Sequence, residues 1–98
     1  MPTLKATDSD LHAVEAFLKK RKLKHLVARK RADAVILDAG TKADPWPRAR
    51  VRRVTAQWWT LDVADHLGRW EQTPLRAPLQ EILAELGDSF PWVLADLF

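Results

Sequence analysis

Two stretches of the chain concentrate positive charge. KKRKLKHLVARKR covers residues 19–31 and RARVRR covers residues 48–53, and together they hold twelve of the sixteen Lys and Arg residues and no Asp or Glu. Such groups neutralise phosphates and release counterions, which favours nucleic-acid binding. If the second stretch is a strand beside the first, we expect one basic binding surface. It would consist of Lys19, Lys20, Lys22, Arg29, Arg31, Arg48, Arg50 and Arg52.

The same charges also fit a solvated surface without a ligand. Lysines near the C-terminus of a helix are favoured by the helix dipole. Residues 1–53 carry fourteen Lys and Arg against six Asp and Glu, whereas residues 54–98 carry two against seven. This asymmetry is consistent with a basic binding face, or with two halves that attract each other across one fold.

Five tryptophans could provide stacking surfaces or fill the core. Trp59 is in phase with Leu61 and Val63, so we expect it in the core, and Trp70 would pack on the same layer after a short turn. Trp58 points the opposite way and is the indole whose exposure is in question. A small domain needs several large side chains to fill its core, so we expect mostly packing.

The C-terminal segment SFPWVLADLF is too apolar to extend into water. We expect it to close the fold by packing on the sheet. Part of it, with Trp58, would also suit a symmetric dimer or an interface with another protein. The residues of this predicted interface are Trp58, Phe90, Trp92, Leu97 and Phe98.

The sequence contains no clear catalytic motif. His66 lies near Asp62, Asp65 and Glu71, but residues 65–68 are typical of a turn. His12 and His25 are suitable for acid–base chemistry, yet their spacing indicates no site. The chain has no cysteine, three isolated glycines and two serines at predicted helix caps. We therefore predict no enzymatic activity, no metal and no cofactor.

The elements that must position these residues follow from hydrophobic periodicity. Residues 9–23 have a helical apolar stripe after a capping-box pattern at Thr7 and Asp10. Residues 26–31, 34–39, 48–55, 58–64 and 69–73 are expected as strands, with residues 38–47 as a loop and a phase slip at 52–53 that a bulge would explain. Pro74–Pro78 is expected to break the sheet before a helix that stops at Gly87.

Short connections between successive strands favour an antiparallel meander. We therefore predict one α+β domain over residues 1–98: an N-terminal helix, a four- to five-stranded meander sheet, and one or two C-terminal helices on one face. No signal peptide or membrane span is recognised, so a cytoplasmic location is expected. The abundance of Ala, Leu, Arg and Asp is typical of GC-rich bacteria.

The run WWTLDVADHLGRWEQTPLRAPLQEILAELGDSFPWVL resembles small bacterial proteins of unknown function. Their shared features are a W-x-L strand, a G-R-W turn, Thr-Pro, and a leucine-rich helix. The resemblance covers roughly the C-terminal half and implies a hairpin followed by a helix, without an activity. The sequence thus predicts a small binding domain for nucleic acid or another polyanion, with a protein-interaction module or homodimer as the alternative.

Overall fold

The computed structural model describes residues 5–40, 43–65 and 67–94. None of the helices in these ranges is long and apolar enough to cross a membrane. In chain order the elements are α1 (Asp8–Lys20), β1 (Val27–Arg31), β2 (Ala34–Gly40), β3 (Pro45–Arg53), β4 (Trp59–Ala64), β5 (Trp70–Ala77), α2 (Leu79–Ser89) and the 3₁₀ helix η1 (Pro91–Leu94).

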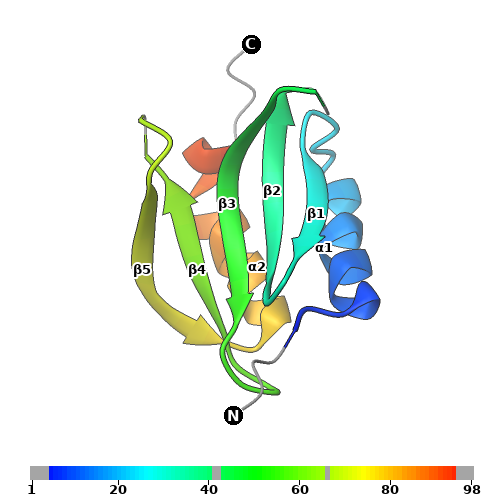
Figure 1. Ribbon diagram of the computed structural model, residues 1–98, viewed down its shortest axis with the longest axis vertical. Helices are drawn as coiled ribbons and strands as arrows, with labels where there is room; N and C mark the ends of the chain where they lie inside the picture. The colour runs from blue at the N-terminus through cyan, green and yellow to red at the C-terminus, as the bar shows by residue number, and fades with distance from the viewer. Residues whose placement is uncertain (1–4, 41–42, 66, 95–98) are drawn as a thin grey trace.

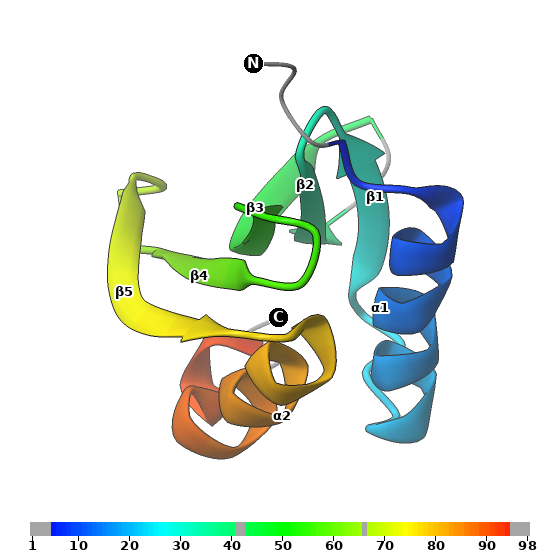
Figure 2. The ribbon, with the colours of Figure 1, turned by 90° about the horizontal axis from the view of Figure 1, so that it is seen from below.

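The strands form one five-stranded antiparallel sheet in the order β1-β2-β3-β4-β5, so each strand pairs with the next one along the chain. Both α-helices and η1 lie behind the sheet in Figure 1, and no helix or strand of the described residues covers the opposite face. This confirms the predicted α+β meander. Figure 2 shows that β5 curves strongly out of the plane of the other strands.

Helix α1 begins at the predicted capping box. The Thr7 amide donates to Asp10 Oδ2 at 2.8 Å, and the Asp10 amide donates to Thr7 Oγ1 at 3.2 Å. The helix ends at Lys20, three residues before the predicted end, because Lys22 adopts a positive φ of 58° that stops a right-handed helix. The expected strand at 26–31 then begins one residue late, at Val27.

The predicted loop at 38–47 is wrong at both ends. Asp38–Gly40 belongs to β2 and pairs with Pro45–Pro47 of β3. The register shifts between Leu37 and Asp38, which pair with Ala49 and Pro47 and leave Arg48 as the extra residue of a bulge. The phase slip at 52–53 needs no bulge, because Arg53 continues the ladder opposite Trp59.

Strand β5 is longer than predicted and runs through Pro74 to Ala77. Proline lacks an N–H donor. Because β5 is an edge strand with β4 as its one neighbour, the N–H groups on its outer side need no ladder partner, and an edge strand can therefore accommodate proline. The pairing with β4 is irregular between Thr60 and Asp62, so Pro74 falls in a distorted part of the strand. The prediction that residues 74–78 break the sheet is therefore wrong.

Helix α2 passes the predicted stop at Gly87 and ends at Ser89. Gly87 instead lets the Arg21 side chain approach α2 closely, because a Cβ at this position would lie 3.0 Å from Arg21 Cζ. The Arg21 guanidinium donates to Asp88 Oδ1 at 3.1 Å, so α1 and α2 are joined across this contact. The apolar segment after α2 forms η1, whose Val93 and Leu94 are buried, as expected of a segment that closes the fold.

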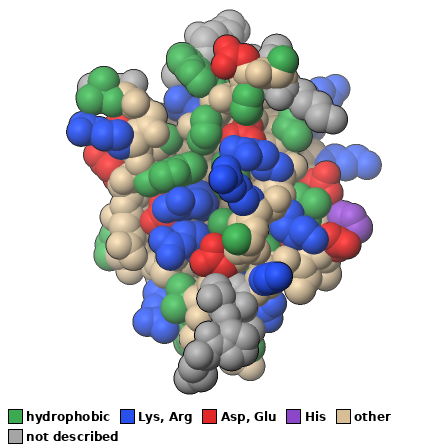
Figure 3. All heavy atoms as spheres, in the orientation of Figure 1, with side chains coloured by type: hydrophobic (Ala, Val, Ile, Leu, Met, Phe, Trp, Pro, Cys, Tyr) green, Lys and Arg blue, Asp and Glu red, His purple; other side chains and the backbone are tan. Residues whose placement is uncertain are grey.

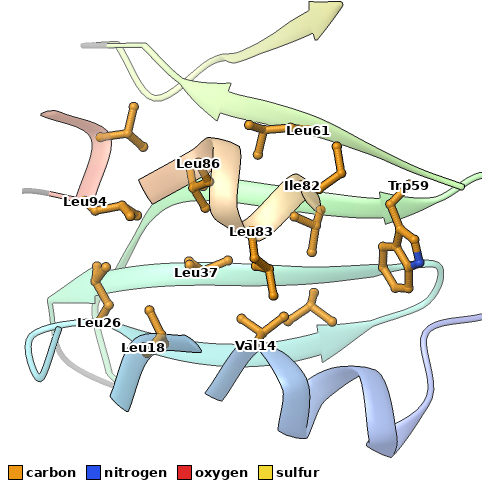
Figure 4. Packing of buried hydrophobic residues seen from close by; sticks show 14 of the residues in the cluster. Val14, Leu18, Leu26, Leu37, Trp59, Leu61, Ile82, Leu83, Leu86 and Leu94 are labelled. Carbon is orange, nitrogen blue, oxygen red and sulfur yellow. The ribbon is translucent and has the colours of Figure 1, made fainter. Parts of the chain in front are cut away.

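The core lies between the sheet and the helices. Trp59 and Leu61 of β4 point toward the helices as their alternation predicted, and Leu37 of β2 points the same way (Figure 4). The helices contribute apolar stripes at helical spacing. The helical core residues are Val14 and Leu18 of α1 and Ile82, Leu83 and Leu86 of α2.

Truncation of Leu37 should therefore destabilise the fold strongly. Its side chain is fully buried, and Leu37→Ala leaves a cavity that costs about 2–5 kcal/mol of unfolding free energy. The matched control is Leu67→Ala, because Leu67 is 63% exposed and its truncation should cost less than about 0.5 kcal/mol. Urea denaturation followed by tryptophan fluorescence measures both. Equal losses in the two variants would contradict this description of the core.

Candidate functional site

The face of the sheet opposite the helices is rich in arginine. On β3, Val51 is fully buried toward the helices, so Arg50 and Arg52 point to the other side. Residues directly opposite each other on neighbouring strands share a face, so the cross-strand register identifies the residues of this face on every strand. Its residues, called the open face below, are Val27, Arg29, Arg31, Ala34, Ile36, Asp38, Pro47, Arg50, Arg52, Thr60, Asp62, Ala64, Trp70, Gln72 and Arg76. Figure 3 views this face and shows Lys and Arg side chains gathered over its middle among carboxylates.

A buried carboxylate organises the centre of the open face. Asp62 is 2% exposed and lies opposite Arg50 in the ladder. Its Oδ2 accepts from Arg50 Nε at 2.9 Å and Nη2 at 2.8 Å, and Arg52 Nη1 lies 3.9 Å away. Because a carboxylate with so little access to water must be paired, Asp62 fixes where the Arg50 guanidinium lies.

A second buried carboxylate, that of Asp38, binds Arg29 of the edge strand β1. Asp38 is 6% exposed, and its Oδ2 accepts from Arg29 Nε at 2.5 Å. Its Oδ1 is buried with no hydrogen-bond partner among the described residues. At the β1–β2 turn, Asp33 lies 3.8 Å from Arg52 Nε. Three aspartates therefore offset part of the positive charge of this face.

The remaining charge is still positive. Arg31 and Arg76 are exposed, and neither forms an ion pair within the described ranges. The five arginines of the open face, its two aspartates Asp38 and Asp62, and Asp33 at the adjoining turn together have a net charge of +2. Arg76 was not predicted to belong to this face, because the sheet was expected to end at Pro74. The role of Asp62 was not predicted either. The available signal was that Asp62 alternates with Leu61 and so faces away from the core, as do Arg50 and Arg52.

Trp70 belongs to the open face and not to the core. It pairs with Ala64 in register and lies across β4 from Arg50, whose Cζ is 4.5 Å from the centroid of the Trp70 ring. The expectation that Trp70 shares a layer with Trp59 is wrong, because β5 pairs with β4 in a register that turns Trp70 outward. A cation over an indole face at this distance is attracted by the ring quadrupole.

Arg48 is not part of this face, although the sequence placed it there. Because it occupies the bulge, it leaves the alternation of Arg50 and Arg52. Its Nε donates to the Val93 carbonyl oxygen at 2.8 Å and its Nη2 donates to that of Trp92 at 3.4 Å. Arg48 therefore anchors η1 to the sheet.

The lysines of α1 lie in the other layer. Lys19, Lys20 and Lys22 are exposed at the C-terminal end of α1, where Lys19 and Lys22 border a shallow hollow of about 430 Å³ with an apolar floor. Lys30 reaches α1 instead and donates to Asp8 at 2.5 Å, and this hydrogen bond lowers the pKa of the Asp8 carboxyl. The single basic surface predicted from sequence is thus divided between the two sides of the protein.

The predicted interface residues do not form one patch in the described part of the chain. Trp58 is 43% exposed beside the β3–β4 turn, whereas Trp92 is 62% exposed in η1, beyond the far end of α2 (Figure 1). Phe90 is partly buried and packs against Trp92, with ring centroids 5.4 Å apart. Leu97 and Phe98 lie outside the described residues.

No hydrogen bond joins the two histidines in the described part of the chain, His12 and His25. His12 is exposed on α1, and His25 lies after it, where its Nε2 is 2.6 Å from the Leu94 carbonyl oxygen. His66 lies outside the described residues. Next to it, backbone N–H groups of Arg69 and Leu67 donate to Asp65 and lower its pKa, which fits the predicted turn. Within residues 5–40, 43–65 and 67–94, no group of three His, Asp or Glu side chains could hold a metal ion.

Comparison with known proteins gives no match: no family model, curated protein or solved structure is similar to this chain. The resemblance of the C-terminal half to small bacterial proteins therefore stays a prediction.

Loss of the buried carboxylate should cost stability. Asp62→Ala leaves the partly buried Arg50 guanidinium without its hydrogen-bond acceptor, and we expect a loss of about 1–3 kcal/mol in unfolding free energy. The control is Asp88→Ala, because Asp88 pairs with Arg21 with a side chain 66% exposed and should contribute less than about 1 kcal/mol. Chemical denaturation measures both. Asp62→Ala with wild-type stability would show that this carboxylate does not organise the face.

Proposed function

We propose that this protein binds polyanions, and nucleic acid in particular, through the open face of its sheet. The observation that supports this most is the set of five arginines that the meander brings from three strands, β1, β3 and β5, to one side. A face with net positive charge and no covering element among the described residues attracts phosphates electrostatically.

The arginines would have two roles. Arg31 and Arg76, which have no ion pair within the described ranges, would neutralise phosphates, whereas Arg29 and Arg50 are held by buried aspartates and would present guanidinium groups in fixed positions. Held side chains lose little conformational entropy on binding. Phosphate contacts position a nucleic acid without reading its sequence, so we propose binding with little sequence preference.

Charge reversal of the unpaired arginines tests this function. Reversal of Arg50 would place a second carboxylate beside buried Asp62 and threaten the fold, so the variant is Arg31→Glu with Arg76→Glu. At about 0.1 M salt we expect an at least tenfold lower affinity for a labelled oligonucleotide and a shallower dependence on salt. Fluorescence anisotropy over a salt series measures both quantities.

The control makes the same change in charge on the helix layer. Lys19→Glu with Lys20→Glu should keep most of the affinity, because salt at this concentration screens charges beyond about 10 Å. If the wild type ignores oligonucleotides and heparin at about 50 mM salt, the proposal is wrong. It is also wrong if the lysine variant loses binding and the arginine variant keeps it.

A homodimer or protein-interaction module is the second candidate, and exposed tryptophan at one end of the sheet favours it. Trp46 and Trp92 are 52% and 62% exposed, and both lie near Arg48, which shares a surface hollow with Trp46 and donates to the Trp92 carbonyl oxygen. Indole rings are enriched at protein interfaces.

Light scattering of the purified protein tests this candidate. A dimer predicts twice the mass of the chain, and Trp92→Ala should return the monomer, because removal of a central aromatic contact commonly costs more than about 2 kcal/mol of binding free energy. Trp58→Ala is the matched control at the other end of the sheet and should leave the mass unchanged. A wild-type monomer at every concentration would exclude the homodimer.

A further inference from the structure

Three side chains from three adjacent strands form a layered arrangement on the open face. Trp70 of β5 contributes an indole ring, and the Arg50 guanidinium from β3 lies over it, 4.5 Å from the ring centroid. Asp62 of β4, between them in the sheet, accepts from two nitrogens of Arg50 through Oδ2. The guanidinium is thus held at one edge by a carboxylate and on one side by an aromatic ring.

This arrangement changes what Arg50 offers a ligand. Its charge is offset by a carboxylate that is 2% exposed, so it is a weak partner for phosphate. What remains is a planar group whose side chain is 24% exposed. Nucleic-acid bases stack on aromatic rings and on guanidinium planes, and such stacking tolerates every base. Arg50 and Trp70 together offer surfaces of this kind.

The surroundings suit an unpaired strand. Arg52 and Arg76 flank Thr60 in the cross-strand register and place positive charge beside the layered group. The exposed Gln72 lies opposite Asp62, so an amide that can donate and accept hydrogen bonds is adjacent. Figure 2 shows β5 curving away from the plane of the sheet, and Trp70 begins this strand.

We propose that Trp70 and Arg50 form a base-stacking platform, and that the nucleic acid bound by the open face is single-stranded. This inference rests on the proposed function and deepens it. In a duplex the bases are already stacked on each other and their faces are inaccessible. Only an unpaired strand can place a base on the platform while its phosphates contact the arginines.

Three probes of equal length separate stacking from charge. They are a labelled twelve-residue oligothymidylate, a twelve-unit abasic strand with the same phosphates and no bases, and a twelve-base-pair duplex. At about 50 mM salt, we expect the oligothymidylate to bind at least about fivefold more tightly than the abasic strand, because one stacked base contributes that much or more. We also expect it to bind more tightly than the duplex.

Trp70→Leu removes the ring and keeps an apolar side chain. We expect it to lower the affinity for oligothymidylate to that for the abasic strand, and to leave abasic binding unchanged, which also shows that the face is still folded. Trp70→Phe retains an aromatic ring and should restore most of the difference. Trp58→Leu removes another partly exposed indole and should change neither affinity.

The possible results separate the base-stacking platform from polyanion binding by the open face. If neither strand binds, polyanion binding itself fails. If both bind equally and Trp70→Leu changes neither, polyanion binding stands and the platform is wrong. An equal loss for both strands in Trp70→Leu would also overturn the platform, because the effect of Trp70 would then not depend on bases. Tighter binding of the duplex would overturn the single-stranded preference.

Discussion

The carboxylate of Asp62 is the group on which the open face of this protein depends. It is buried in the middle of a sheet surface that carries five arginines, and its Oδ2 accepts from Arg50 while Arg52 lies within 4 Å. Without a negative charge at this position, neighbouring arginines on β3 would repel each other. With it, they lie close together and the face keeps a net positive charge.

The same sheet separates two kinds of stabilisation. Toward the helices, Leu37, Val51 and Leu61 bury apolar surface against α1 and α2. Away from the helices, Arg29 of β1 pairs with Asp38 of β2, and Arg50 of β3 pairs with Asp62 of β4. Because each strand alternates its side chains between the two faces, a register slip of one residue would exchange core and charge. The buried carboxylates would make such a slip costly.

The charge asymmetry between the two halves of the chain has a mixed outcome. Arg50 with Asp62 and Arg21 with Asp88 join the basic half to the acidic half. Arg29 finds its partner Asp38 within its own half. Attraction between the two halves is therefore part of the fold, and the arginines without carboxylate partners give the open face its net positive charge.

Local sequence determined the order of elements. The alternation around Trp59 indicated a half-buried strand, the capping box at Thr7 located the first helix, and short turns indicated a meander, because each signal depends on residues a few positions apart. Tertiary structure decided which charges meet. A bulge directs Arg48 away from the open face, and the β4–β5 register places Trp70 on it. Asp62 binds Arg50, which lies twelve residues earlier in the chain. Pairing between strands sets these contacts. Hydrophobic periodicity fixes which face of a strand is buried, but a slip of two residues would keep that face buried and change every cross-strand partner.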